Sequence, residues 1–218
     1  MFIHLGTPLK LDELRLRCPD ISILKKKMHI AIIDDEPFYR LEALRANGFI
    51  LNNLGDITSI DQIEAFPIVV CDIKGVGNAF GSSYEGAHVL SEIRKAFPDK
   101  YLISFSGATF DASFNESLST ADASATKDAN VDQWITLLEK GLKSVGDPIQ
   151  RWLRFRSSLV GKGVDIFEVF KLEQSFIKAI KNKDNSLLKP NDASEDIKDL
   201  VIKFSTFALK QILEEIDF

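Results

Sequence analysis

The chain has 218 residues, of which 45% are hydrophobic and 27% charged, and its formal net charge is -5. This composition is ordinary for a soluble globular protein, and the acidic balance argues against a protein dedicated to nucleic acid. The two cysteines, Cys18 and Cys71, are too few for a disulfide framework or a cysteine zinc site, which fits a reducing compartment. The first residues lack a basic region followed by a long apolar stretch, and no later segment has the length to span a bilayer. We therefore expect a cytoplasmic protein with no membrane segment.

From His29 onward, short apolar runs alternate with amphipathic stretches. Such alternation indicates a parallel sheet with crossover helices. The predicted strands, in chain order, are residues 29–33, 48–54, 67–72, 100–106 and 123–127. The predicted helices are residues 36–48, 85–97 and about 130–143, with a short polar-apolar segment at 59–66. Five strands alternating with helices between residues 28 and 144 favour a doubly wound α/β fold with the strand order 2-1-3-4-5.

The alternating pattern ends where Gly146, Asp147 and Pro148 interrupt it. The apolar residues that follow recur at helical spacing, which predicts an all-α C-terminal region. The residues before the first strand form an extension whose lysine run, Lys25–Lys27, is most simply a solvated face. The expected domains are an N-terminal extension at 1–27, an α/β domain at 28–145 and a helical region at 146–218.

Polar side chains gather where the predicted strands end. Asp34 and Asp35 follow the first strand and Asp72 ends the third, and these two strands are neighbours in the order 2-1-3-4-5. Three carboxylates so close would repel one another strongly unless a cation lay among them, and Mg²⁺ prefers such oxygen ligands. Ser106 and Lys127 end the fourth and fifth strands at the same edge, where a hydroxyl and an ammonium group could neutralise and orient a phosphoryl group.

At these four strand ends the sequence resembles the receiver domains of bacterial two-component response regulators. The resemblance rests on IIDDEP, VVCD, ISFSGA and ATKD, in that order, and covers about residues 28–144. It implies that Mg²⁺ is held by Asp34, Asp35, Asp72 and the backbone carbonyl of Lys74. It also implies a sensor histidine kinase or phosphotransfer protein as the partner that donates phosphate.

By the same resemblance Asp72 is the phosphoacceptor, Ser106 is the hydroxyl residue that follows the phosphoryl group, and Lys127 is its charged partner. Ser104, two residues earlier, competes with Ser106 if the strand boundary is misplaced. The implied function is a phosphorylation-controlled regulator with no enzymatic activity beyond its own phosphorylation and dephosphorylation. A phosphatase-like enzyme would need an aspartate two residues after the nucleophile, where Lys74 stands.

Three departures from the family pattern leave an alternative open. Gly75–Val76 replace the usual Met-Pro pair and open a long loop, Asp128 replaces the proline after the lysine, and Ser124 replaces the usual aromatic residue. The alternative is a pseudo-receiver that acts as a phosphorylation-independent protein-interaction scaffold.

The helical region carries as many acidic as basic residues, so it lacks the net positive charge that is typical of a DNA-binding region. We expect a module that binds an output protein or forms a homodimer, because long apolar faces lie near the C-terminus.

Overall fold

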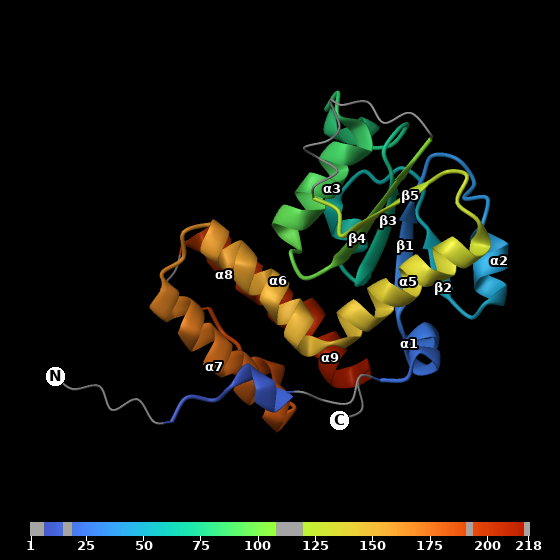
Figure 1. The fold of residues 1–218 in the computed structure, drawn as a ribbon. Coiled ribbons are helices and arrows are strands. Elements are labelled where there is room, and N and C mark those ends of the chain that lie inside the picture. Colours follow the sequence, from blue (N-terminus) through green and yellow to red (C-terminus); the bar gives the residue numbers. More distant parts are fainter. Residues whose placement is uncertain (1–6, 15–18, 108–119, 191–193, 216–218) are drawn as a thin grey trace. The chain divides into compact units, whose positions relative to one another are not determined.

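The computed structural model describes residues 7–14, 19–107, 120–190 and 194–215 (Figure 1). Its internal contacts define two compact units, an α/β unit within Cys18–Gly146 and a helical unit that combines Asp147–Phe218 with Met1–Arg17. The residues expected to form one N-terminal extension are therefore divided. The short 3-10 helix η1 (Leu11–Leu14) buries Leu14 in the helical unit, whereas α1 (Ile21–Lys27) buries Leu24 in the α/β unit.

The α/β unit is built on a five-stranded parallel sheet with the order β2-β1-β3-β4-β5, which confirms the expected fold class. Its central strands are buried along almost their whole length, as expected for a parallel sheet covered by helices on both faces. The strands are β1 (His29–Ile33), β2 (Ile50–Asn53), β3 (Ile68–Asp72), β4 (Tyr101–Ser106) and β5 (Ala123–Thr126).

Helices cover both faces of this sheet (Figure 1). On one face α1, α2 (Leu41–Ala46) and α5 (Val131–Gly146) pack together over a core in which Phe38, Phe105 and Trp134 meet edge to face. On the other face lies α3 (Glu85–Ala96), and the 3-10 helices η2 (Ile60–Ile63) and η3 (Asn78–Phe80) stand in the connections that precede it.

The helix α2 is shorter than the stretch 36–48 that the sequence predicted. It begins at Leu41, and the residues before it form a loop that contacts the loop after β5. There Tyr39 Oη and Arg40 Nε both donate to the carbonyl oxygen of Ala129, at 3.3 and 3.4 Å. The loop after β1 and the loop after β5 are thus joined.

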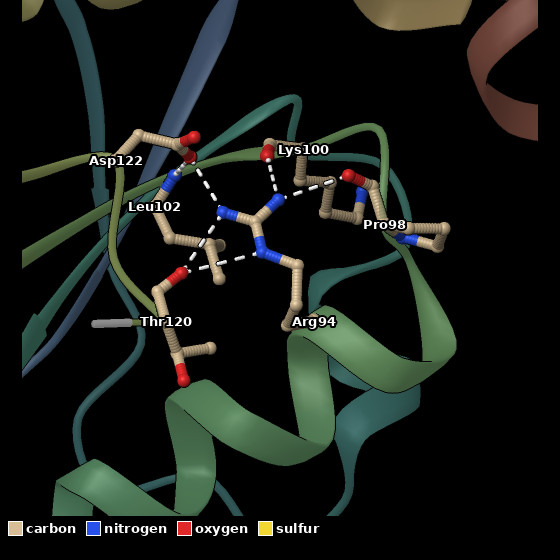
Figure 2. A network of polar contacts seen from close by, with 6 residues as sticks. All are labelled: Arg94, Pro98, Lys100, Leu102, Thr120 and Asp122. Atoms are coloured by element: carbon tan, nitrogen blue, oxygen red, sulfur yellow. Dashed lines mark hydrogen bonds and ion pairs between the residues drawn. The ribbon is translucent and has the colours of Figure 1, made fainter. Parts of the chain in front are cut away.

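The start of β5 is fixed by Arg94 of α3 (Figure 2). The guanidinium group donates to the carbonyl oxygens of Pro98, Lys100 and Thr120 and forms a 2.6 Å ion pair with Asp122. Asp122 Oδ2 also accepts a 2.8 Å hydrogen bond from Leu102 N in β4. One side chain therefore ties α3 and the loop before β4 to the chain entering β5.

The helical unit, described by itself, is all α, as predicted for its described residues. Asp147 and Asp165 cap its first two helices by accepting backbone hydrogen bonds. Its core includes the stacked pairs Trp152–Phe176 and Phe155–Phe204. Its elements are η1, α6 (Pro148–Gly161), α7 (Ile166–Asn182), η5 (Asn185–Leu187), α8 (Glu195–Lys203), the π-helical η6 (Phe204–Leu209) and α9 (Lys210–Glu215). None of the helices in the described part of the chain is long and apolar enough to cross a membrane.

Candidate functional site

Three aspartates meet at the carboxyl edge of the sheet. Asp34 follows the last residue of β1, Asp35 comes next, and Asp72 is the last residue of β3. Because β1 and β3 are paired in parallel, their ends lie side by side, and each aspartate offers a ligand oxygen within 4.8 Å of the others. Asp34 and Asp72 are buried, whereas Asp35 is exposed, so the group is open to solvent on one side.

Burial makes this cluster electrostatically unfavourable. Burial raises the pKa of Asp34, and the negative charges of Asp72 and Asp35 raise it further. The 3.0 Å hydrogen bond from Glu36 N to Asp34 Oδ1 opposes this change but does not cancel it. The ionised form of Asp34 is thus destabilised by the fold itself.

Lys127 supplies the compensating charge to Asp72. Its ammonium nitrogen lies 2.6 Å from Asp72 Oδ2, and its backbone N–H donates to the carbonyl oxygen of Ser106 at 2.8 Å, which extends the pairing of β5 with β4. Burial on its own would lower the pKa of Lys127. The close contact with Asp72 and the nearby charges of Asp34 and Glu36 outweigh burial, and the pKa is raised.

The two serines of β4 have different surroundings. Ser104 and Ser106 are both buried and, two residues apart in a strand, project to the same face. The hydroxyl of Ser104 lies 2.9 Å from that of Ser124 in β5, which is the residue in the place of the usual aromatic. Ser106 ends the strand beside Lys127, at the same edge as Asp72. The structure therefore gives Ser104 a partner within the sheet and leaves Ser106 at the edge where the carboxylates meet.

The turn after β3 packs directly against the carboxylates. Lys74 N donates to Asp72 Oδ1 at 3.2 Å. Gly75 has a φ of +82°, and a Cβ atom added there would lie 2.5 Å from Asp35 Oδ1. The backbone that carries the Lys74 carbonyl therefore runs beside Asp35, and a side chain at position 75 would displace that carboxylate.

Two acidic residues that hold this turn were not predicted. Asp56, in the loop after β2, and Glu85, the first residue of α3, accept hydrogen bonds from the turn's backbone. Asp56 follows the edge strand β2, so the predicted strand order was enough to place it at the carboxyl edge of the sheet. Nothing in the sequence indicated which backbone groups either residue would meet.

The chemistry of this donor set fits Mg²⁺. The ligands are carboxylate oxygens, which this hard cation prefers, and the exposed side at Asp35 leaves access for the waters that Mg²⁺ retains. Asp72 Oδ2 is buried and accepts no well-aligned hydrogen bond from the described residues, with Lys127 as its ion-pair partner. A divalent cation would offset the cost of burying the ionised Asp34 and the repulsion from Asp72 and Asp35, which together raise the pKa of Asp34.

No family model and no curated protein matches the chain. Solved structures that match it include response regulator receiver domains, the class that the sequence resembles. A CheY-like receiver domain protein from Methanospirillum hungatei JF-1 is 22% identical, with a TM-score of 0.43, and the match covers 53% of this chain and 93% of that one. TrrA from Thermotoga maritima, solved with Mg²⁺-BeF, is 23% identical, with a TM-score of 0.41 and coverage of 52% and 97%. A complex of the histidine kinase ThkA with TrrA matches at 23% identity, a TM-score of 0.40 and the same coverage.

Proposed function

We propose that this chain is a response regulator whose α/β unit accepts a phosphoryl group on Asp72 from a phosphohistidine. The donor would be a sensor histidine kinase or a phosphotransfer protein. One observation carries the proposal: a buried carboxylate at a strand end has a lysine ammonium 2.6 Å away and two further carboxylates within 4.8 Å. A capping aspartate needs neither arrangement, whereas phosphoryl transfer to a carboxylate uses both.

In the proposed reaction a carboxylate oxygen of Asp72 attacks the phosphorus atom of the phosphohistidine. An O–P bond forms, the P–N bond breaks, and its electron pair returns to the imidazole nitrogen. Lys127 neutralises charge on the transferred group, and the Ser106 hydroxyl donates a hydrogen bond to it. Asp34, Asp35, Asp72 and the Lys74 carbonyl would hold Mg²⁺, which supplies positive charge that draws donor and acceptor together.

The helical unit is the proposed output region. Apolar side chains are exposed on several of its helices, among them Ile166 and Phe167 on α7 and Ile202 on α8. Exposed apolar side chains on a helical surface suit protein contact, either with an output partner or with a second copy of the chain. Conversion of the Asp72 carboxylate to an acyl phosphate changes the charge that faces Lys127. We propose that the output region responds to this local change of charge.

The proposal is tested by exposing the purified chain to acetyl phosphate with Mg²⁺ and measuring its intact mass. We expect one phosphoryl adduct on the wild type and on Asp61→Asn, and none on Asp72→Asn. Asp61 is an exposed aspartate on η2, so its variant controls for loss of one negative charge. An unmodified wild type that also fails to bind Mg²⁺ by calorimetry would refute the proposal and leave the interaction scaffold as the better description.

A further inference from the structure

The turn that follows the proposed phosphoacceptor is held by a carboxylate from a distant part of the sheet. Asp56 Oδ1 accepts a 2.5 Å hydrogen bond from Gly77 N, and Asp56 Oδ2 accepts from Asn78 N at 3.2 Å and from Asn78 Nδ2 at 2.9 Å. The same Asn78 amide donates to the carbonyl oxygen of Gly75 at 3.0 Å. One carboxylate thus fixes two consecutive backbone N–H groups and, through Asn78, the peptide that follows Gly75.

The other side of the turn is fixed by Glu85. Its Oε2 accepts a 3.1 Å hydrogen bond from Gly75 N, and Glu85 itself has a φ of 47°, a left-handed conformation uncommon for a residue with a side chain. Because the peptide bond is planar and trans, the Lys74 carbonyl points opposite to the Gly75 N–H. Glu85 therefore sets the direction of the carbonyl that would bind the metal.

These contacts restrain a turn whose backbone is unusual. Gly75 and Gly77 both have positive φ, at +82° and +86°, so the chain there follows neither a strand nor a helix. Hydrogen bonds to an ionised acceptor are shorter and stronger than those between neutral groups, so Asp56 restrains the turn more firmly than a neutral side chain would. Gly75 in turn packs on the Asp35 carboxylate.

We propose that Asp56 is a positioning residue for the metal site. It holds the turn at residues 74–78 so that the Lys74 carbonyl and the Asp35 carboxylate are in place before a cation binds, although Asp56 is not one of the ligands. This inference rests on the proposed function, because it assumes that the aspartate cluster binds Mg²⁺. Residues that orient metal ligands change affinity by about 10- to 100-fold when they are altered.

The test compares Asp56→Asn with Asp61→Asn. The Asp61 variant removes the same charge from the same connection after β2, but the Asp61 side chain is exposed and lies beside the Ser59 hydroxyl. Hydrogen exchange of the Gly77 and Asn78 amides is measured without metal, and Mg²⁺ affinity is measured by calorimetry. We expect Asp56→Asn to speed exchange at both amides by about tenfold. It should also weaken Mg²⁺ binding by about tenfold, whereas Asp61→Asn should match the wild type in both measurements.

Unchanged exchange in Asp56→Asn would overturn the inference, and so would faster exchange with unchanged Mg²⁺ affinity. Far-UV circular dichroism and the melting temperature of each variant show whether the fold is retained. A variant that unfolds is replaced by Asn78→Ala, which leaves Asp56 in place but removes the amide that links it to Gly75 O. If the wild type itself bound no Mg²⁺, the proposed function would fail, and the exchange rates alone would decide whether Asp56 holds the turn.

Discussion

Substitution of Gly75 by alanine separates the stability of the turn from the geometry of the proposed metal site. Gly75 and Gly81 both have positive φ, at +82° and +63°. An alanine forced into this region costs about 1–2 kcal/mol. The two positions differ in one respect: a Cβ atom at Gly75 would lie 2.5 and 2.6 Å from the two Asp35 carboxylate oxygens, whereas at Gly81 it would meet nothing within 4 Å.

The overlap at Gly75 can be relieved only if Asp35 moves. Ordinary contact with a Cβ atom begins at 3.4 Å, so the carboxylate must shift by about 1 Å. Asp35 is exposed and can rotate, so this shift adds little to the cost of unfavourable φ. We therefore expect Gly75→Ala and Gly81→Ala to lower the free energy of unfolding by a similar amount, about 1–2 kcal/mol.

Metal affinity should distinguish the two variants. Mg²⁺ demands near-ideal octahedral geometry, so a carboxylate displaced by about 1 Å is lost as a ligand. Gly75→Ala should raise the Mg²⁺ dissociation constant at least about tenfold, equivalent to about 1.4 kcal/mol, while Gly81→Ala should leave it unchanged.

The measurements are calorimetric titration with Mg²⁺ and denaturant unfolding followed by Trp134 fluorescence. A Trp152→Phe background makes Trp134 the sole tryptophan, so that the unfolding signal comes from the α/β unit. Equal Mg²⁺ affinity in Gly75→Ala and Gly81→Ala would show that the contact between Gly75 and Asp35 does not shape the site, and the reasoning would be wrong.

Three further predictions concern other parts of the α/β unit. In a Cys18→Ser background, Cys71 should react with a thiol reagent only after denaturant is added. Cys71 is buried, and burial together with the neighbouring charge of Asp72 raises the pKa of its thiol well above the ordinary range. Fast labelling of the native chain would contradict this prediction. Arg94→Met should lower the free energy of unfolding by about 2–3 kcal/mol in denaturant titrations, because it leaves Asp122 and the nearby carbonyl oxygens without their donor. The control Lys95→Met removes an exposed ion pair with Glu92 and should change the free energy of unfolding by less than about 0.5 kcal/mol. Asp34→Asn should raise the free energy of unfolding at neutral pH without Mg²⁺, because the raised pKa means that the fold disfavours the ionised carboxylate. The gain should fade as the pH falls through that pKa and Asp34 takes up a proton, and Mg²⁺ should stabilise the wild type but not the variant; a gain that persists in acid would contradict this account.

The fold and the three aspartates could be predicted because both depend on local sequence patterns. A run such as residues 67–72 is apolar throughout, which indicates a strand buried on both faces, and the strand order then brings its last residue, Asp72, beside Asp34. The start of α2 was predicted too early because Tyr39 and Arg40 bind Ala129, about ninety residues later in the chain. Contacts of this kind leave no periodic signal.

The conformation of the turn after β3 could not be predicted for a related reason. Gly75 and Gly77 stand in this turn, but glycine permits many conformations and selects none. The selection comes from Asp56, 21 residues before Gly77, and from Glu85 at the start of α3. A carboxylate that accepts backbone N–H groups looks the same in sequence as one that faces solvent.

Lys127 alone does not compensate the charge of all three carboxylates in the site. The pKa of Asp34 and that of Lys127 are both raised, but for different reasons. Burial is the main cause at Asp34, with the charges of Asp72 and Asp35 adding to it, whereas at Lys127 the contact with Asp72 and the nearby charges of Asp34 and Glu36 outweigh burial. Lys127 lies 2.6 Å from Asp72 and satisfies that carboxylate, but the ionised form of Asp34 remains unfavourable in its presence. A cation bound among the three carboxylates would favour the ionised form of Asp34, which burial and the neighbouring carboxylates disfavour.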